Sequence, residues 1–84
     1  MEECYISKDN DIGSLVRQRA NNKEEYFVKD LGNDTFVITN NNNNLEITIQ
    51  ENSSVCFSGE KKDIEKSFED IFWNLKDKMV LKQT

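Results

Sequence analysis

Apolar and polar residues alternate through the middle of the chain, and this pattern limits the possible folds more than any other feature. The clearest run covers residues 45–50, LEITIQ, in which Leu45, Ile47 and Ile49 alternate with polar residues. Successive side chains of a strand point to opposite faces, so the run gives one apolar and one wet face. Residues 24–31, 34–39 and 55–58 follow a similar pattern between short turns. The region therefore predicts an antiparallel meander of three to four strands.

Helical spacing replaces this alternation on both sides of the meander. Ile12, Leu15 and Val16 follow acidic residues suited to capping, which predicts a short helix over about residues 11–20. Residues 3–7, ECYIS, are a further candidate strand. From about residue 59 to 79, apolar residues recur every three or four positions and predict one long helix. These are Ile64, Phe68, Ile71, Leu75 and Met79.

The fold class that these patterns predict is α+β, in a single domain over residues 1–84. A short N-terminal helix and the β-meander would be followed by the long C-terminal helix, packed on one face of the sheet. A chain of 84 residues is long enough for one modest core and leaves no room for a deep second layer.

The charge of the chain limits the kind of partner it can have. Its net charge is −5 and its pI is near 4.6. Affinity for nucleic acid comes largely from Lys and Arg that neutralise phosphates, so direct binding of nucleic acid is disfavoured. No run of residues approaches the roughly 20 apolar positions that span a bilayer, and the acidic start is unlike a secretory signal. We therefore expect a cytoplasmic protein that neither binds nucleic acid directly nor enters a membrane.

Residues with catalytic chemistry are few. The chain has no His, which removes the usual acid–base shuttle near neutral pH, and it has no Gly-rich phosphate loop. Its two cysteines, Cys4 and Cys56, match no metal or redox spacing, and in the cytoplasm both would be reduced thiols. We expect no enzyme activity, no cofactor and no metal site.

Acidic residues without nearby cations mark the meander as a candidate contact surface. No Lys or Arg occurs between Asp30 and Glu60, a stretch that also contains Asp34, Glu46 and Glu51. Carboxylates spread along a sheet could imitate a row of phosphates and occupy a basic groove on another protein. The alternative is ordinary surface charge that keeps a small domain in solution.

Trp73 is a second candidate for protein contact. On the predicted long helix it falls about 180° from Ile64 and outside the apolar stripe, and Val80 follows it one heptad later on nearly the same side. An outward Trp next to a Val, surrounded by charged residues, has the composition of an interface hot spot. The alternative is that Trp73 packs at the helix edge against the N-terminal segment.

The run of asparagines from Asn40 to Asn44 is predicted to be a hairpin loop. Its amides could hydrogen-bond to a partner, or the loop could simply be solvated. In size, charge and element order, the chain resembles the small acidic anti-CRISPR and anti-defence proteins of phages. That resemblance implies an inhibitor that binds a protein with a basic surface, in some cases by DNA mimicry, in the host cytoplasm.

Two further functions fit the sequence. The first is an immunity protein or antitoxin that blocks a basic toxin cleft. The second is a structural subunit that forms homo-oligomers through the Trp73 and Val80 face or through edge strands. The sequence is compatible with either a monomer or a homodimer.

Overall fold

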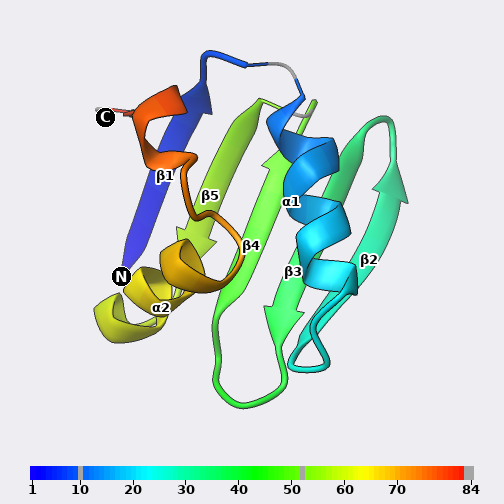
Figure 1. Ribbon diagram of the computed structural model, residues 1–84, viewed down its shortest axis with the longest axis vertical. Coiled ribbons are helices and arrows are strands. Elements are labelled where there is room, and N and C mark those ends of the chain that lie inside the picture. Colours follow the sequence, from blue (N-terminus) through cyan, green and yellow to red (C-terminus); the bar gives the residue numbers. More distant parts are fainter. Residues whose placement is uncertain (10, 52, 83–84) are drawn as a thin grey trace.

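The computed structural model describes residues 1–9, 11–51 and 53–82, and these form a mixed α+β domain (Figure 1). Among these residues, two α-helices, a short 3₁₀ helix and six strands follow one another. In order they are β1 (Glu2–Ser7), α1 (Ile12–Asn21), β2 (Tyr26–Gly32), β3 (Thr35–Asn40), β4 (Glu46–Gln50), β5 (Ser54–Ser58), α2 (Lys61–Asp70), η1 (Lys76–Lys78) and β6 (Met79–Leu81).

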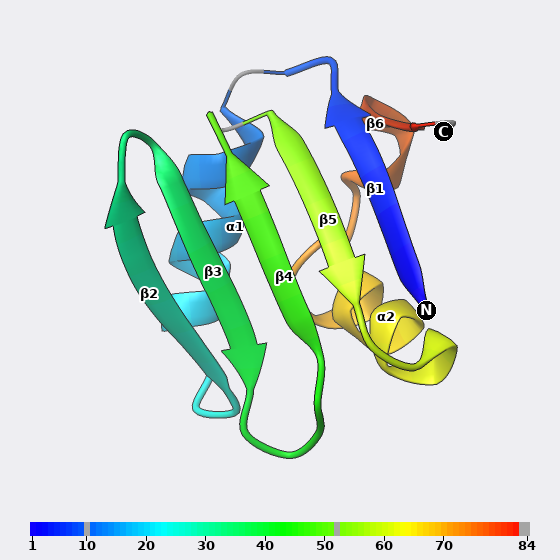
Figure 2. The same cartoon turned by 180° about the vertical axis from the view of Figure 1, so that it is seen from behind.

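All six strands belong to one antiparallel sheet in the order β2-β3-β4-β5-β1-β6. The meander expected from the alternating pattern is present as β2 to β5. Figure 2 shows that β1 lies beside β5 and continues the sheet past the meander. The last strand, β6, then pairs with the outer side of β1. β1 and β6, the first and last strands of the described residues, therefore lie side by side at one edge of the sheet.

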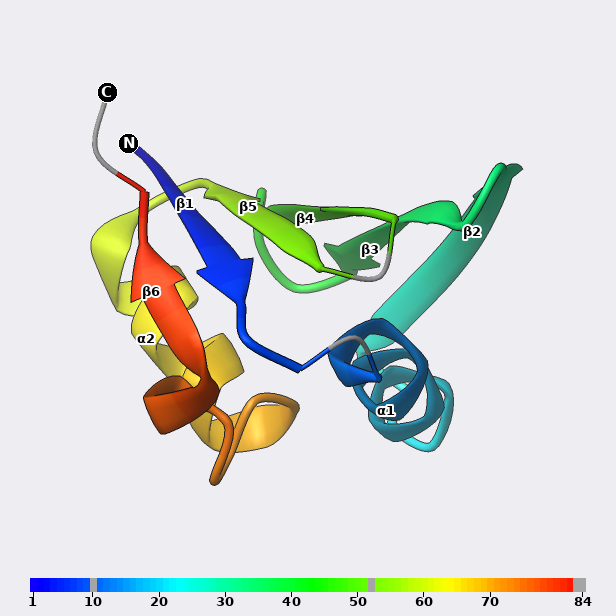
Figure 3. The same ribbon diagram turned by 90° about the horizontal axis from the view of Figure 1, so that it is seen from above.

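Both α-helices lie on the same side of the sheet (Figure 3). The core lies between them and the sheet, and it contains the apolar side chains that the alternation places inward, such as Ile38, Ile47 and Phe57. In the part of the chain that the structure describes, no helix covers the other side. We call this side the open face. It carries the outward residues of each strand, including Phe27 of β2 and Ile6 of β1.

The short N-terminal helix is confirmed. Ile12, Val16 and Ala20 are buried at successive turns of α1, as their spacing of four residues requires. Leu15 was expected on the same apolar edge, but its side chain is 37% exposed. It points along the side of α1 that faces residues 71–78 and leaves an apolar group at the surface there.

The prediction of one long C-terminal helix is wrong, because α2 ends at Asp70. The backbone N–H groups of Ile71 and Phe72 both donate to the Ser67 carbonyl, at 2.9 and 3.2 Å, and close α2 at this point. Asn74 then takes a left-handed conformation with φ of +64°, which a helix cannot continue through. Ile71 and Phe72 turn into the core instead. Of the predicted apolar stripe, Ile64, Ile71, Leu75 and Met79 are buried and Phe68 is partly buried, but they belong to a bent chain and not to one helix.

The predicted number of strands, three to four, is also too low. Residues 3–7 do form part of a strand, as their composition suggested. The sixth strand was missed because Met79 fits the helical spacing of the preceding apolar residues. In the structure Met79 is buried, while Val80 and Leu81 are exposed on the edge strand.

Cys4 and Cys56 are joined by a disulfide, so the expectation of two reduced thiols is wrong. They are 52 residues apart in the chain but directly opposite each other in the pairing of β1 with β5. Sequence spacing could not reveal this, because it depends on the sheet order. The expected cytoplasmic location loses one of its arguments, since disulfides persist mainly in oxidising compartments. None of the helices among the described residues is long and apolar enough to cross a membrane.

Candidate functional site

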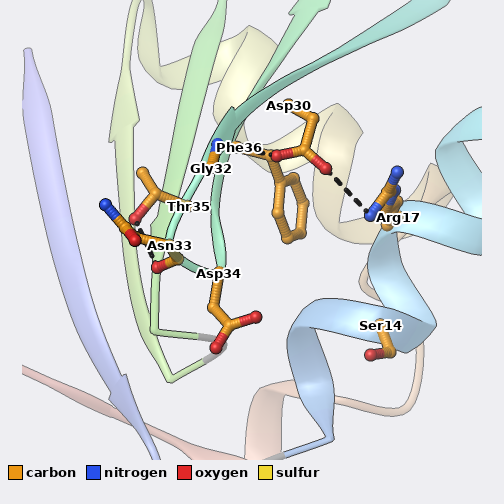
Figure 4. A pocket seen from close by; sticks show the side chains of 8 residues that line it. All are labelled: Ser14, Arg17, Asp30, Gly32, Asn33, Asp34, Thr35 and Phe36. Carbon is orange, nitrogen blue, oxygen red and sulfur yellow. Dashed lines mark hydrogen bonds and ion pairs between the residues drawn. The ribbon is translucent and has the colours of Figure 1, made fainter.

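A polar hollow lies between α1 and the β2–β3 hairpin. We call it the hairpin hollow; it measures about 280 Å³ and is lined by Ser14, Arg17, Asp30, Gly32, Asn33, Asp34, Thr35 and Phe36. Figure 4 shows Arg17 and Asp30 pointing toward each other across it. Arg17 Nη1 lies 3.4 Å from Asp30 Oδ2, and its guanidinium carbon is 5.9 Å from the centroid of the Phe36 ring.

The turn at the tip of the hairpin positions Asp34 at this hollow. Gly32, Asn33 and Asp34 have φ values of +84°, +54° and +58°, and glycine, Asn and Asp tolerate this left-handed region best. The Asp30 carboxylate accepts the N–H of Gly32 at 2.8 Å as well as pairing with Arg17. Two predicted contact residues, Asp30 and Asp34, are thus brought together, but Asp30 is already engaged within the domain.

The other predicted carboxylates lie elsewhere. Glu51 is in the turn between β4 and β5, at the same end of the sheet as Asp34. Glu46 pairs with Ser58 at the opposite end and projects from the open face. Glu60 precedes α2 and lies 3.4 Å from Lys62. The carboxylates therefore do not line up in one row, and Lys29 shares the open face with Glu46.

Trp73 lies in the turn after α2, not on a helix. Its side chain is 49% exposed, and the guanidinium carbon of Arg19 sits 3.7 Å from the centroid of its ring. Val80 is equally exposed. It belongs to β6, where it pairs with Ile6 of β1 and points to the open face. The two residues lie on different sides of the sheet, so the predicted common Trp73 and Val80 face does not form.

Arg19 fixes the turn that carries Trp73. Its Nη1 donates to the Trp73 carbonyl at 2.7 Å and more weakly to the Ile71 carbonyl at 3.4 Å. Burial lowers the pKa of Arg19 below its ordinary value, but a guanidinium keeps its charge at any physiological pH. The ring of Trp73 is therefore held by a cation on one side while about half of its surface remains open to solvent.

A second hollow lies on the other side of α1, next to this turn. We call it the α1 groove; it measures about 310 Å³ and its exposed lining is mainly apolar. It is lined by Asp9, Asp11, Ile12, Ser14, Leu15, Gln18 and Leu75. Leu15 and Arg19 are one helical turn apart on the same side of α1, and Leu75 follows Trp73 by two residues. Trp73 is therefore near the groove along both segments, although it is not part of the lining.

One end of the α1 groove is acidic. Asp9 Oδ2 lies 3.6 Å from Lys78 Nζ, and both groups are about half exposed. The Oδ1 atom of Asp9 also accepts the N–H of Asp11 at 2.9 Å, which fixes the chain just before α1. Among the ion pairs of the described residues, none includes Asp11.

A polar cluster fastens the end of α2 to the sheet. Tyr26 Oη donates to Asp70 Oδ2 at 2.9 Å, and Lys66 Nζ donates to the same oxygen at 2.9 Å. Burial raises the pKa of Tyr26, and its bond to Asp70 raises it further. Burial also raises the pKa of Asp70, but the bonds from Lys66 and Tyr26 outweigh this and hold it below the ordinary value. The cluster is structural and positions residues 71–75.

The asparagine run forms a loop, as predicted, with defined hydrogen bonds. Asn40 is buried at the end of β3 and its Oδ1 accepts the N–H of Asn42 at 2.8 Å. The Oδ1 of Asn43 likewise accepts the N–H of Leu45, and the backbone N–H of Asn41 donates to the Glu25 carbonyl. The side chains of Asn40 and Asn43 thus stabilise the turn itself, and Asn41 ties it to the residue before β2.

Sequence reasoning missed the α1 groove and the role of Arg19. The available signal in the sequence was the position of Leu15, which lies outside the four-residue spacing of Ile12, Val16 and Ala20. Among residues 1–9, 11–51 and 53–82, no three His, Cys, Asp or Glu side chains gather closely enough to hold a metal ion. No protein-family model, curated protein or solved structure matches this chain.

Proposed function

We propose that this chain is a small acidic inhibitor or regulator that binds another protein through the α1 groove and Trp73. The observation that carries the proposal is the half-exposed Trp73 ring, held by Arg19 one helical turn along α1 from Leu15 of the apolar groove. Tryptophan is enriched among the few interface residues that supply most of the binding energy. A side chain that is fixed before binding also loses less rotamer freedom on association.

The acidic composition supports a partner with a basic surface. The chain has a net charge of −5, and two carboxylates line one end of the groove. Complementary charge of this kind guides encounter and orientation more than it adds affinity. On size and charge, we propose a phage anti-CRISPR or anti-defence protein that acts in the host cytoplasm. An immunity protein or antitoxin is the alternative with the same type of contact.

The placement of the carboxylates favours the groove over DNA mimicry as the mode of contact. Mimicry needs carboxylates at a regular spacing along one surface, whereas Asp34 and Glu46 lie at opposite ends of the sheet. Homo-oligomer formation through edge strands is disfavoured as well. At one edge β2 carries Lys29 and a register shift after Asp30, and β6 at the other edge has three residues. Both features are typical of protected edges.

Affinity capture with matched variants tests the proposal. The tagged protein would be incubated with nuclease-treated extract of the source cells, so that nucleic acid cannot bridge to a partner. We expect capture of a defined protein by the wild type and by Phe27→Ser, which changes an exposed apolar residue on the open face. Capture should fall at least tenfold with Trp73→Ala and with Leu15→Ser. Equal capture by all four proteins, or loss only with Phe27→Ser, would reject this contact surface.

A further inference from the structure

The dimensions of the α1 groove indicate what can occupy it. Its volume of about 310 Å³ is at the lower end of the range of roughly 300–1,000 Å³ for ligand pockets. Ile12, Leu15 and Leu75 supply its apolar lining from two segments. A hollow of this size accepts a single large apolar side chain.

The charges around the groove determine what should stand next to that side chain. Asp11 immediately precedes α1, at the end of the helix where negative charge is favourable. Its side chain makes no capping bond to the helix, so the carboxylate is available to a ligand. Asp9 lies at the same end and shares Lys78 at 3.6 Å. A cation in the ligand therefore meets two carboxylates and one lysine at this end.

We propose that the α1 groove binds a short peptide segment of a partner protein, in which one large apolar residue is next to a Lys or Arg. The apolar side chain enters between Leu15 and Leu75, and the cation pairs with Asp11. Trp73 covers the other end of the segment from its position on Arg19. This inference rests on the proposed protein-binding function and specifies the chemistry of the partner.

A second copy of this chain is the rival occupant. Leu81 is 54% exposed and is followed by Lys82, so the end of one molecule carries the proposed apolar–basic pair itself. However, two copies with a net charge of −5 each repel one another, and Leu81 and Lys82 are held against β1 in the pairing of β6. We therefore commit to a segment from another protein and treat self-association as an outcome of the test.

Short peptides test the proposal directly. The probes are N-acetylated, C-amidated tetrapeptides with the sequences Ala-Leu-Lys-Ala, Ala-Leu-Glu-Ala and Ala-Ser-Lys-Ala. Each would be titrated to 10 mM into the full chain labelled with ¹⁵N, with amide shifts and Trp73 fluorescence as readouts. We expect the Leu-Lys peptide to shift the amides of Leu15, Gln18 and Leu75 and to alter the emission of Trp73, the only Trp in the chain. The Leu-Glu and Ser-Lys peptides should bind more weakly.

Two variants separate the charge from the fold. Asp11→Asn should weaken binding of the Leu-Lys peptide about two- to fivefold, as expected for an exposed ion pair, and should reduce the preference over Leu-Glu. Asp34→Asn, on the opposite side of α1 in the hairpin hollow, is the matched control. It should leave the affinity for the Leu-Lys peptide and the preference over Leu-Glu unchanged. An unchanged amide spectrum outside the substituted region would show that each variant is folded.

Several results would overturn the inference. These are no shift with any peptide at 10 mM, equal shifts with Leu-Lys and Leu-Glu, or shifts centred on the hairpin hollow or open face. Groove shifts that appear without peptide as protein concentration rises would assign the groove to a second copy instead. The proposed function fails separately, because it depends on capture that is sensitive to Trp73 and Leu15. If that capture holds while the peptides show no charge preference, only the apolar–basic chemistry is rejected.

Discussion

Arg19 of α1 and Trp73 of the turn after α2 lock together two segments that are 54 residues apart in the chain. The guanidinium lies over the indole ring at 3.7 Å, and Nη1 of the same group donates to the Trp73 carbonyl at 2.7 Å. One side chain therefore fixes both the backbone and the ring of Trp73. This contact sets the distance between α1 and the segment that contributes Leu75 to the α1 groove.

Removing the contact between Arg19 and Trp73 should loosen the turn without unfolding the domain. We predict that Arg19→Ala lowers the free energy of unfolding by about 1–2 kcal/mol, since it removes a cation–π contact and hydrogen bonds from a charged donor. Trp73 should also show a lower fluorescence anisotropy and a red-shifted emission. Urea unfolding and steady-state fluorescence measure these changes. Arg17→Ala removes a half-exposed ion pair instead and should cost less than about 1 kcal/mol. Equal effects of the two substitutions would contradict the claim that Arg19 fixes the turn at Trp73.

Asn74 provides a test of where the C-terminal helix stops. Its φ of +64° is strained for residues with a branched or bulky side chain and free of strain for glycine. Asn74→Ala should therefore lower the free energy of unfolding by about 1 kcal/mol, and Asn74→Gly should leave it unchanged or raise it. Thermal unfolding followed by circular dichroism measures both. Asn22→Ala, at an ordinary φ of −88°, is the control. If Asn74→Ala stabilised the protein, the chain would continue as a helix through this position.

The contrast between the meander and the C-terminal segment explains what the sequence could predict. Alternation identifies β2 to β5 because each strand is paired with its neighbour along the chain, so local pattern and long-range pairing agree. After Asp70 they differ. Leu75 and Met79 keep helical spacing, but β1 has a free edge that residues 79–81 pair with. Nothing local to residues 79–81 indicates that partner, which is more than 70 residues away.

The candidate site was predictable in part for the same reason. The sequence left open whether Trp73 points outward or packs against the N-terminal segment. In the structure its side chain is half-exposed on a turn and also contacts Arg19 of α1. Its contact with Arg19 depends on how the two segments cross in space. The placement of Asp34 and Glu46 at opposite ends follows from the direction of each strand, which was predictable. The pairing of Asp30 with Arg17 depends on the position of α1 over β2 and β3, and that position could not be predicted from the sequence.

The two tyrosines should titrate abnormally in the folded protein. Burial and a hydrogen bond to Glu3 at 2.7 Å raise the pKa of Tyr5 to about 12, and burial and Asp70 raise that of Tyr26 further. A raised pKa in the folded state means that this stability is complete below about pH 10, the ordinary tyrosine value, and is lost as the pH rises toward 12. Absorbance at the phenolate band should stay low at pH 10.5 without urea and rise in urea. Tyr26→Phe should leave one delayed titration, and a normal midpoint in the native wild type would contradict both hydrogen bonds.

The Cys4–Cys56 disulfide should contribute more to stability than any single contact described above. It closes a loop of 52 residues, and the loss of loop entropy in the unfolded chain corresponds to roughly 4 kcal/mol for a loop of this length. Reduction with dithiothreitol should therefore lower the midpoint of urea unfolding while circular dichroism below the transition stays unchanged, because β1 keeps its pairing with both β5 and β6.

The double variant Cys4→Ser with Cys56→Ser is the control, and it should unfold at the midpoint of the reduced wild type and be insensitive to the reductant. Intact mass spectrometry under denaturing, non-reducing conditions checks the bond itself, since the oxidised chain lacks two hydrogens. An unfolding midpoint that does not respond to the reductant in an oxidised sample would mean that the unfolded chain is already compact enough for the bond to add no constraint.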